Sequence, residues 1–156
     1  QLAQPERQVV TLSGDGGLAM LMGELLTVRQ HDLPIKIVVL NNSSLNFVEL
    51  EMKAAGLPGF GTDLDNPDFS QVAEACGIKG WRVTEAEDLE GSLREAFAHD
   101  GPALVDVVTE RQELTIPPAI SAEQVKGFTL YALRTVMSGR GDELLDLSRA
   151  NLRQIF

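Results

Sequence analysis

An aspartate stands inside a glycine-rich turn near the start of the sequence. Asp15 lies in the segment VVTLSGDGGLAM, residues 9–20, where a short apolar run gives way to a helical pattern. A strand-to-helix turn of this kind aims backbone N–H groups at an anion. The carboxylate of Asp15 would repel a phosphate held directly, and the dinucleotide fingerprint that Gly14, Gly16 and Ala19 formally match has no use for that charge. We therefore expect a cation between Asp15 and the bound anion.

Two asparagines follow the next apolar run along the chain. Asn41 and Asn42 end the segment IKIVVLNN, residues 35–42. Neighbouring parallel strands end at one edge of a sheet, where open α/β folds bind their ligands. Asp15 and Asn42 would then face one another as two hard oxygen ligands, and diphosphate oxygens would complete the octahedron that Mg²⁺ demands. The two segments thus predict a site in which magnesium bridges the protein and a diphosphate.

The elements that must position these residues alternate along the first two thirds of the chain. Apolar runs predict strands at residues 9–14, 35–42, 81–84 and 103–109, and amphipathic patterns predict helices at residues 18–31, 45–55, 68–75 and 85–99. Because two of the strands are apolar throughout, we expect an α/β fold with a parallel sheet flanked by helices on both faces. Residues 56–67, rich in Gly, Pro and Asp, predict a long loop. Residues 121–139 and 141–156 predict two further helices.

Composition limits the classes of protein to consider. The chain has 156 residues, 44% of them hydrophobic, and a formal net charge of -10. This content suits a domain with a buried core, while the acidic balance and the lack of a Lys/Arg cluster argue against nucleic acid as a partner. A single cysteine, Cys76, excludes a disulfide framework and favours a reducing compartment. Because the first strand begins almost at once, we expect a fragment of a longer protein.

The pairing of GDGG, residues 14–17, with the asparagine pair on the next predicted strand resembles the diphosphate- and metal-binding motif of the thiamine diphosphate-dependent enzymes. The resemblance implies their diphosphate-binding fold, here incomplete at its N-terminus. It also implies that Asp15, Asn42 and the backbone carbonyl of Ser44 bind Mg²⁺. The cofactor-binding residues that it implies are Gly14, Asp15, Gly16, Gly17, Asn42, Ser43, Ser44 and Leu45. Asn41 is interpreted as a residue that shapes the turn.

The stretch NNSSLNFVELEMKAAG, residues 41–56, is similar more narrowly to the pyruvate oxidases and the quinone-dependent pyruvate dehydrogenases. This likeness implies catalytic roles for Phe47, between the thiazolium and the flavin region, and for Glu51, close to the substrate. The implied enzyme converts pyruvate to acetate and CO₂ and passes two electrons through FAD to a quinone; its substrate is pyruvate or another 2-oxo acid. Its FAD is bound mainly by a domain absent from this chain. The glutamate that activates the cofactor is also absent from this chain, so we expect the chain to be inactive alone.

The segment LTIPPAISAEQVKGFTLYALRTVMSGRGDELLDL is similar to the carboxyl-terminal region of the bacterial quinone-dependent enzyme, which regulates it and binds membranes. We therefore expect a diphosphate- and Mg²⁺-binding domain at residues 1–112 and a helical C-terminal tail at residues 113–156. The last predicted helix would place one apolar face on a bilayer interface, on a partner or on the parent enzyme. That face comprises Leu144, Leu145, Leu152, Ile155 and Phe156. The implied enzyme is a homo-oligomer, a tetramer at full length, in the cytoplasm and peripheral at the inner face of the cell membrane.

Other interpretations remain open. Within the thiamine enzymes these are the acetolactate synthases and the benzoylformate decarboxylases, and outside them a non-catalytic α/β binding module. Phe47 would then be a core residue and Glu51 a solvated helix residue. The two histidines, His31 and His99, are expected at solvent-exposed helix ends, and Trp81 as a packing residue.

Overall fold

The computed structural model describes residues 1–112 and 121–155, with side chains as far as residue 151. The chain packs as two units. Unit 1 comprises residues 1–43 and 65–109, and unit 2 comprises residues 44–64 and 110–156. The units are described one at a time. They cut across the predicted division at residue 112, which concerns binding roles and stays a prediction.

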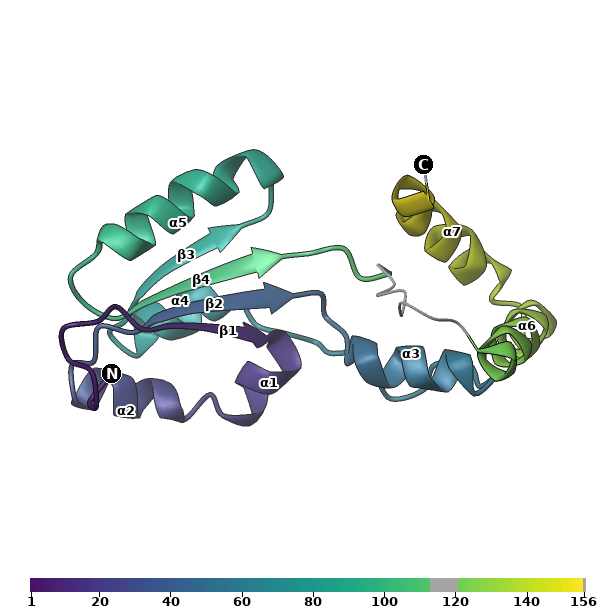
Figure 1. Ribbon diagram of the computed structural model, residues 1–156, viewed down its shortest axis with the longest axis horizontal. Coiled ribbons are helices and arrows are strands. Elements are labelled where there is room, and N and C mark those ends of the chain that lie inside the picture. The colour runs from purple at the N-terminus through teal and green to yellow at the C-terminus, as the bar shows by residue number, and fades with distance from the viewer. Residues whose placement is uncertain (113–120, 156) are drawn as a thin grey trace. The chain divides into compact units, whose positions relative to one another are not determined.

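Unit 1 is built on a parallel sheet of four strands in the order β1-β2-β4-β3 (Figure 1). The strands are β1 (Val10–Gly14), β2 (Lys36–Asn41), β3 (Lys79–Val83) and β4 (Ala103–Val108). Gly14 at the end of β1 pairs with Leu40, and Asn41 at the end of β2 pairs with Val108. All carboxyl ends therefore lie at one edge of the sheet, and the predicted α/β fold is confirmed.

Helices cover both faces of this sheet (Figure 1). They are α1 (Asp15–Met20), α2 (Glu24–Gln30), α4 (Phe69–Ala75) and α5 (Leu89–Ala98), with a short 3₁₀ turn, η1 (Ala86–Asp88), before α5. One face carries a buried cluster with α1, α2 and α4: Leu18, Leu25, Ile37, Val39, Phe69, Ala73, Ile78 and Leu104. The other carries a cluster with α5: Val38, Val83, Ala96, Ala103, Val105 and Val107. Because successive β2 side chains enter opposite clusters, the apolar run of this strand is buried on both sides.

The predicted helix at residues 18–31 is two helices in the structure. α1 ends at Met20 and α2 begins at Glu24, because Leu21 leaves the helical region with φ -120° and ψ 20°. Leu18 and Leu25 nevertheless belong to the same buried cluster. Leu18 and Leu25 are seven residues apart, which is two helical turns, so the apolar period continues across the break. The sequence pattern therefore does not reveal that the helix is interrupted.

Unit 2 contains three helices among its described residues: α3 (Asn46–Ala54), α6 (Ala122–Met137) and α7 (Gly141–Ile155). α6 starts with a capping box between Ser121 and Gln124. A Cβ at Gly127 would lie 1.6 Å from the backbone oxygen of Ala54, so only glycine permits this approach of α6 to α3. The described helices include none that is long and apolar enough to cross a membrane.

The interior of unit 2 is polar. Lys53 and Glu49 form an ion pair on α3, with 2.8 Å between Nζ and Oε1 and side chains that are 3% and 9% exposed. Lys53 Nζ lies 5.6 Å from the ring centre of the buried Tyr131 on α6, and its amine also donates to Gln112 Oε1 at 3.1 Å. Residues 56–64 contain no regular helix and are held by bonds such as Leu45 N–H to the Thr62 carbonyl, 2.8 Å, in agreement with the predicted loop.

Candidate functional site

Asp15 is the buried carboxylate of the strand-to-helix turn in unit 1. It is the first residue of α1 and is only 3% exposed. Oδ1 accepts the Gly16 N–H at 2.8 Å, and Oδ2 accepts the Ser43 N–H at 2.7 Å and the Asn66 Nδ2 group at 2.7 Å. The bond from Ser43 joins the turn after β1 to the turn after β2. The prediction that the two turns converge at one edge of the sheet is therefore confirmed.

The turn after β2 bends sharply toward Asp15. Ser43 has φ 56°, a left-handed conformation that is uncommon for serine, and this bend directs its N–H at the Asp15 carboxylate. Asn42, half-buried, immediately precedes it. Backbone strain of this kind tends to occur at functional sites. The segment Asn42–Ser43 thus lies against the aspartate with which it was predicted to act.

The glycines of the turn differ in what surrounds them. No other atom lies within 4 Å of the position that a Cβ at Gly14 would take, whereas at Gly17 a Cβ would meet the Ser13 hydroxyl at 3.2 Å. The bare backbone at Gly14 therefore leaves open space, as a ligand approaching the main chain requires. Gly16 is buried, and its N–H is directed at Asp15. The role of Gly16 and Ser43 at a diphosphate stays a prediction, since both N–H groups bind Asp15 in this structure.

The donor set of this turn is compatible with a hard divalent cation. A carboxylate offers about four lone-pair positions, and the bonds described above occupy three of those on Asp15. Oδ1 accepts one bond and Oδ2 two, so Oδ1 keeps a position for a metal ion. Within the described part of the chain no three His, Cys, Asp or Glu side chains gather as a metal cluster. The predicted ligands, a carboxylate, an amide oxygen and a backbone carbonyl, do not need such a cluster.

A line of polar side chains that the sequence patterns did not reveal extends from Asp15 along the same edge. Asn66, in the segment before α4, bonds to both Asp15 and Asn41, and Asn41 donates to Asp106 Oδ1 at 3.0 Å. Asp106 on β4 is fully buried and accepts from Arg82 on β3 at 2.8 Å. The available signal was the single acid in the apolar strand ALVDVV, residues 103–108, because a buried carboxylate requires partners. Asn41, predicted to shape the turn, is a link in this line.

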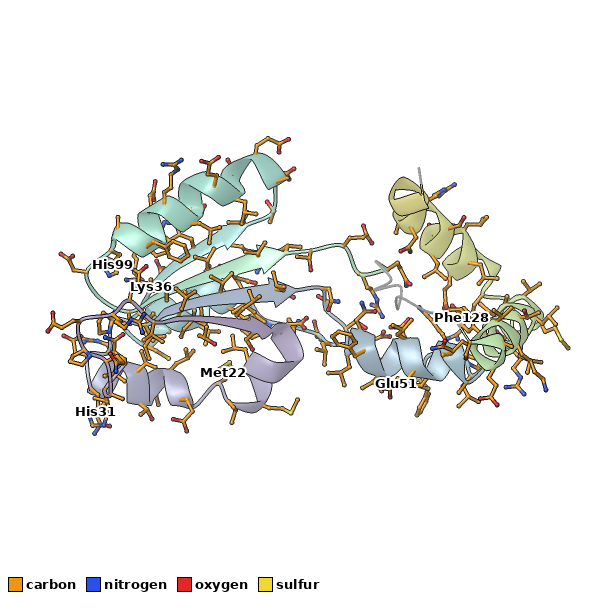
Figure 2. The ribbon with its side chains drawn as sticks, viewed as in Figure 1. Met22, His31, Lys36, Glu51, His99 and Phe128 are labelled. Carbon is orange, nitrogen blue, oxygen red and sulfur yellow. The ribbon has the colours of Figure 1, made fainter. Side chains whose placement is uncertain are left out.

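The remaining predicted site residues belong to unit 2. Ser44 is buried, and its hydroxyl donates to Glu49 Oε2 at 3.0 Å, while Leu45 is half-buried. Phe47 and Glu51 lie on α3, and both are exposed, Phe47 by 74% (Figure 2 labels Glu51). Phe47 is therefore not a core residue of this chain, whereas exposure of Glu51 is compatible with both interpretations of it.

Glu49 is a buried acid that the sequence analysis did not single out. Burial by itself raises the pKa of a carboxyl, but the hydrogen bond and charge of Lys53, with Ser44 and Arg111, hold the pKa of Glu49 below its ordinary value. Arg111 also pairs with Asp63. Glu49, Arg111 and Asp63 border a polar cleft of about 1000 Å³ within unit 2. Two more ion pairs line it, Arg140 with Glu143 and Arg149 with Asp146.

The residues expected to lie outside the site do so. His31 and His99 follow the last residues of α2 and α5, and Figure 2 places both where the strands begin. Asp15 instead directly follows the last residue of β1. Trp81 packs against the buried cluster on the α5 face of the sheet. The half-buried Cys76 packs against the cluster on the opposite face, with α1, α2 and α4. On α7, Leu144 is half-buried and Leu145 is 60% exposed. The side chains of Leu152, Ile155 and Phe156, predicted to share their face, lie outside the described residues.

Comparisons with known proteins find one matching family model. The model of the thiamine pyrophosphate enzyme, C-terminal TPP binding domain, matches residues 1–107. Among solved structures, the thiamine diphosphate-dependent 4-hydroxybenzoylformate decarboxylase of Rhodococcus jostii RHA1 is 34% identical, with a TM-score of 0.67, over 70% of this chain and 21% of that one.

Curated relatives extend the similarity over different shares of the chain. A Bacillus subtilis (strain 168) protein, YdaP, described provisionally as thiamine pyrophosphate-containing, is 38% identical over 99% of this chain and 27% of its own length. The mitochondrial acetolactate synthase of Schizosaccharomyces pombe is 33% identical over 83% of this chain and 20% of its own. The acetolactate synthase isozyme 2 large subunit of Escherichia coli (strain K12) is 35% identical over 80% of this chain and 24% of its own. The chain thus spans about a quarter of the length of these relatives.

Proposed function

Because the chain belongs to the thiamine pyrophosphate enzyme family, as its C-terminal TPP binding domain, we propose that it holds the diphosphate of thiamine diphosphate through Mg²⁺. The observation that carries this proposal is the buried carboxylate of Asp15, joined to the turn after β2 by the Ser43 N–H at 2.7 Å. A negative side chain at that position favours a cation and disfavours direct phosphate binding.

The proposed roles follow the family pattern. Asp15, the Asn42 side chain and the Ser44 carbonyl would ligate Mg²⁺, which retains its other bonds to diphosphate and water. The open backbone at Gly14, with Gly16, Gly17, Ser43 and Leu45, would surround the diphosphate; the open space beside Gly14 supports this. When bound, thiamine diphosphate supplies the carbon nucleophile that attacks the keto carbon of a 2-oxo acid. The chain's own part is to bind and orient the cofactor.

We further propose that the whole protein decarboxylates pyruvate and passes the electrons through FAD to a quinone. The likeness of residues 41–56 to the pyruvate oxidases and the quinone-dependent pyruvate dehydrogenases supports this. Phe47 supports the same proposal, because its ring is 74% exposed on α3 and available to contact a flavin region or substrate. Glu51 is proposed to act on the substrate from the same helix.

A second candidate activity is that of an acetolactate synthase or a 2-oxo acid decarboxylase. The names of the relatives favour it, since two are acetolactate synthases and the solved structure is a 4-hydroxybenzoylformate decarboxylase. The products distinguish the candidates. Pyruvate given to the intact protein with thiamine diphosphate, Mg²⁺, FAD and a quinone analogue should yield acetate and reduced quinone. Acetolactate, or an aldehyde with no quinone reduction, would establish the second candidate.

The assembly and location proposed for the whole protein extend this function. We propose a homo-oligomer, tetrameric at full length, in the cytoplasm and peripheral at the inner membrane face, where a quinone would be available. Of these, only the membrane contact has support within this chain, from Leu145 on α7, which is exposed. Flotation of the intact protein with phospholipid vesicles, with and without residues 141–156, tests the membrane contact.

Replacing Asp15 tests the metal bridge. In the intact protein, Asp15→Ala should weaken thiamine diphosphate binding at fixed Mg²⁺, because the cation loses its carboxylate ligand, and high Mg²⁺ should restore binding only in part. Calorimetric titration of the cofactor measures this. Asp65→Ala is the matched control, since Asp65 is an exposed aspartate of unit 1. Equal or tighter binding by Asp15→Ala would mean that phosphate is held directly and would remove the basis of the proposal.

A further inference from the structure

We propose that Asn66 is a positioning residue of the magnesium site, which holds the Asp15 carboxylate in the orientation that leaves Oδ1 open to the metal ion. The inference rests on the proposed function, because it takes Asp15 as a Mg²⁺ ligand. Asn66 precedes α4 and is distant in the sequence from the two motifs that identify the site. It therefore brings a third segment of unit 1 to that site.

One amide group joins two strand ends. The Nδ2 group of Asn66 donates to Asp15 Oδ2 at 2.7 Å and to Asn41 Oδ1 at 3.0 Å. An amide nitrogen carries two hydrogens, so both are used, one toward the turn after β1 and one toward the end of β2. Neither a hydroxyl, which has one hydrogen, nor a carboxylate, which has none when ionised, can make both bonds. The residue type at position 66 is therefore matched to its two acceptors.

The direction of these hydrogen bonds is fixed from both ends. Asp15 and Asp106 are carboxylates, which accept hydrogen bonds when ionised. Asn41 donates its Nδ2 to Asp106 Oδ1 at 3.0 Å, which turns its Oδ1 toward Asn66. Asn66 must then present its Nδ2 to both Asn41 and Asp15. The line has a single consistent arrangement of donors and acceptors.

The far end of the line is anchored in the sheet. Asp106 is 0% exposed, and its Oδ2 accepts the Phe69 N–H at 3.1 Å and an Arg82 N–H at 2.8 Å. A buried carboxylate with all its partners satisfied resists movement, because breaking any of these bonds leaves an unpaired buried group. Through Asn41, Asn66 thus connects the Asp15 carboxylate to Asp106 on β4 and so fixes the orientation of that carboxylate relative to the sheet.

The consequence for the metal concerns the second oxygen of Asp15. Oδ2 accepts from Ser43 and Asn66 and has both of its lone-pair positions filled, while Oδ1 accepts only the Gly16 N–H. Without Asn66, Oδ2 would have a free position and the carboxylate could rotate away from the metal. Partners that orient a metal ligand typically contribute about 10–100-fold to metal affinity.

The experiment is a calorimetric titration of Mg²⁺ into the intact protein with thiamine diphosphate at saturation. Asn66→Ala should bind Mg²⁺ at least about tenfold more weakly than wild type. Asn66→Ser, which keeps one donor hydrogen, should also bind Mg²⁺ more weakly than wild type. This variant replaces Asn66→Ala in the titration if Asn66→Ala does not fold. The matched control is Asp68→Ala, two residues away. It removes the N-cap bonds that Asp68 accepts from Ser70 and Gln71 and a 3.6 Å ion pair with Arg82, but it leaves the Arg82–Asp106 pair and every hydrogen bond from Asp106 to Asp15 in place.

The melting temperature of the metal-free protein separates positioning from a purely structural role. Asp68→Ala should lower it and leave the Mg²⁺ dissociation constant unchanged. If both Asn66 variants lower it in the same way and bind Mg²⁺ like wild type, the positioning role is overturned. Asp15→Ala included in the series separates this outcome from failure of the proposed function. Normal Mg²⁺ binding by Asp15→Ala would overturn the metal site itself, whereas weak binding by Asp15→Ala with normal binding by Asn66→Ala would overturn only the role of Asn66.

Discussion

The two units differ in the types of side chain that they bury. In the described residues, all buried hydrophobic side chains except Tyr131 belong to unit 1, where they fill both faces of the sheet. The buried side chains of unit 2 are largely polar or charged: Ser44, Glu49, Lys53, Thr62, Thr135 and Asn151. Unit 1 is therefore stabilised mainly by removal of apolar surface from water. The interior of unit 2 instead contains hydrogen bonds and charge pairs, and the charge pairs depend on pH.

The two units contain one matched pair of interactions. Glu49 and Lys53 on α3 and Glu90 and Arg94 on α5 are both acid–base pairs four residues apart, with shortest N–O distances of 2.8 Å and 2.6 Å. Lys53 and Glu49 are 3% and 9% exposed, whereas Arg94 and Glu90 are 78% and 77% exposed. Since the spacing and chemistry are alike, the comparison isolates what burial does to an ion pair. The single Trp81 and the single Tyr131 report on units 1 and 2 separately.

The largest effect is expected in the apolar core of unit 1. Phe69→Ala should lower the free energy of unfolding by about 3–5 kcal/mol, because Phe69 is 0% exposed and its removal leaves a cavity between α4 and the sheet. Urea unfolding followed by Trp81 fluorescence measures it. Phe97→Ala on α5 is the control, since that ring is 38% exposed and its loss should be much smaller. Equal losses for the two variants would mean that burial does not dominate in unit 1.

Breaking the buried ion pair of unit 2 should have the next largest effect. Lys53→Met should cost about 3 kcal/mol, because it leaves the Glu49 carboxylate buried without its closest cation. Near-ultraviolet circular dichroism of Tyr131, which lies beside Lys53, follows the unfolding. The double variant Glu49→Gln with Lys53→Met should recover part of the loss. A double variant that is less stable than Lys53→Met would contradict the unpaired-charge explanation.

Acid should weaken unit 2 through Glu49. The pKa of Glu49 is lowered in the folded chain from an ordinary value of 4.5, because the pull of Lys53, Ser44 and Arg111 outweighs burial. The unfolded chain therefore binds the proton more readily. The stabilisation is present above about pH 4.5 and is lost as the pH falls through the folded-state pKa.

The measurement is the difference in unfolding free energy of unit 2 between pH 7 and pH 4, again followed by Tyr131. Glu49→Gln should be less stable at pH 7 but should lose less on acidification than wild type. Glu123→Gln on α6, where the side chain is exposed, is the control and should follow the wild-type curve. Parallel curves for Glu49→Gln and wild type would assign the acid sensitivity to other groups.

The smallest effect is expected at the exposed pair on α5. Arg94→Met should change the free energy of unfolding of unit 1 by no more than about 0.5 kcal/mol, because water screens both charges. Measured beside Lys53→Met, it gives the contribution of burial to otherwise matched pairs. A loss as large as that of Lys53→Met would show that spacing alone, and not burial, sets the strength.

The sequence predicted those parts of the molecule that a repeating pattern specifies. Apolar runs located each strand within two residues, and the helix predicted at residues 68–75 is α4. In the structure Asp68 is the N-cap of α4, because its side chain accepts the N–H groups of Ser70 and Gln71. The convergence of Asp15 with the turn after β2 was also predictable, since it follows from parallel strands that are neighbours. Local chemistry and topology sufficed for these features.

Features that depend on contacts between distant segments were not predictable. The place of Asn66 between Asp15 and Asn41 depends on how the chain returns to the sheet before α4, and no local period records that return. The association of α3 with α6 depends on Gly127, which in the sequence is one glycine inside a helical pattern. Such residues carry no periodic signal, because a single close approach requires them.

The strand order of unit 1 has a consequence for how the chain emerges from a ribosome. β4 pairs with both β2 and β3 and is the last strand of the sheet to be synthesised. Until Val108 has left the exit tunnel, β3 lacks its partner β4, and β2 pairs with β1 on one side but is open on the side that β4 later occupies. Both open edges are templates for pairing with other chains. At about 5–20 residues per second, translation from Lys36 to Val108 takes several seconds. Nascent chains halted before Ala103 should therefore need a chaperone to stay unaggregated, and chains long enough to place Val108 outside the tunnel should not.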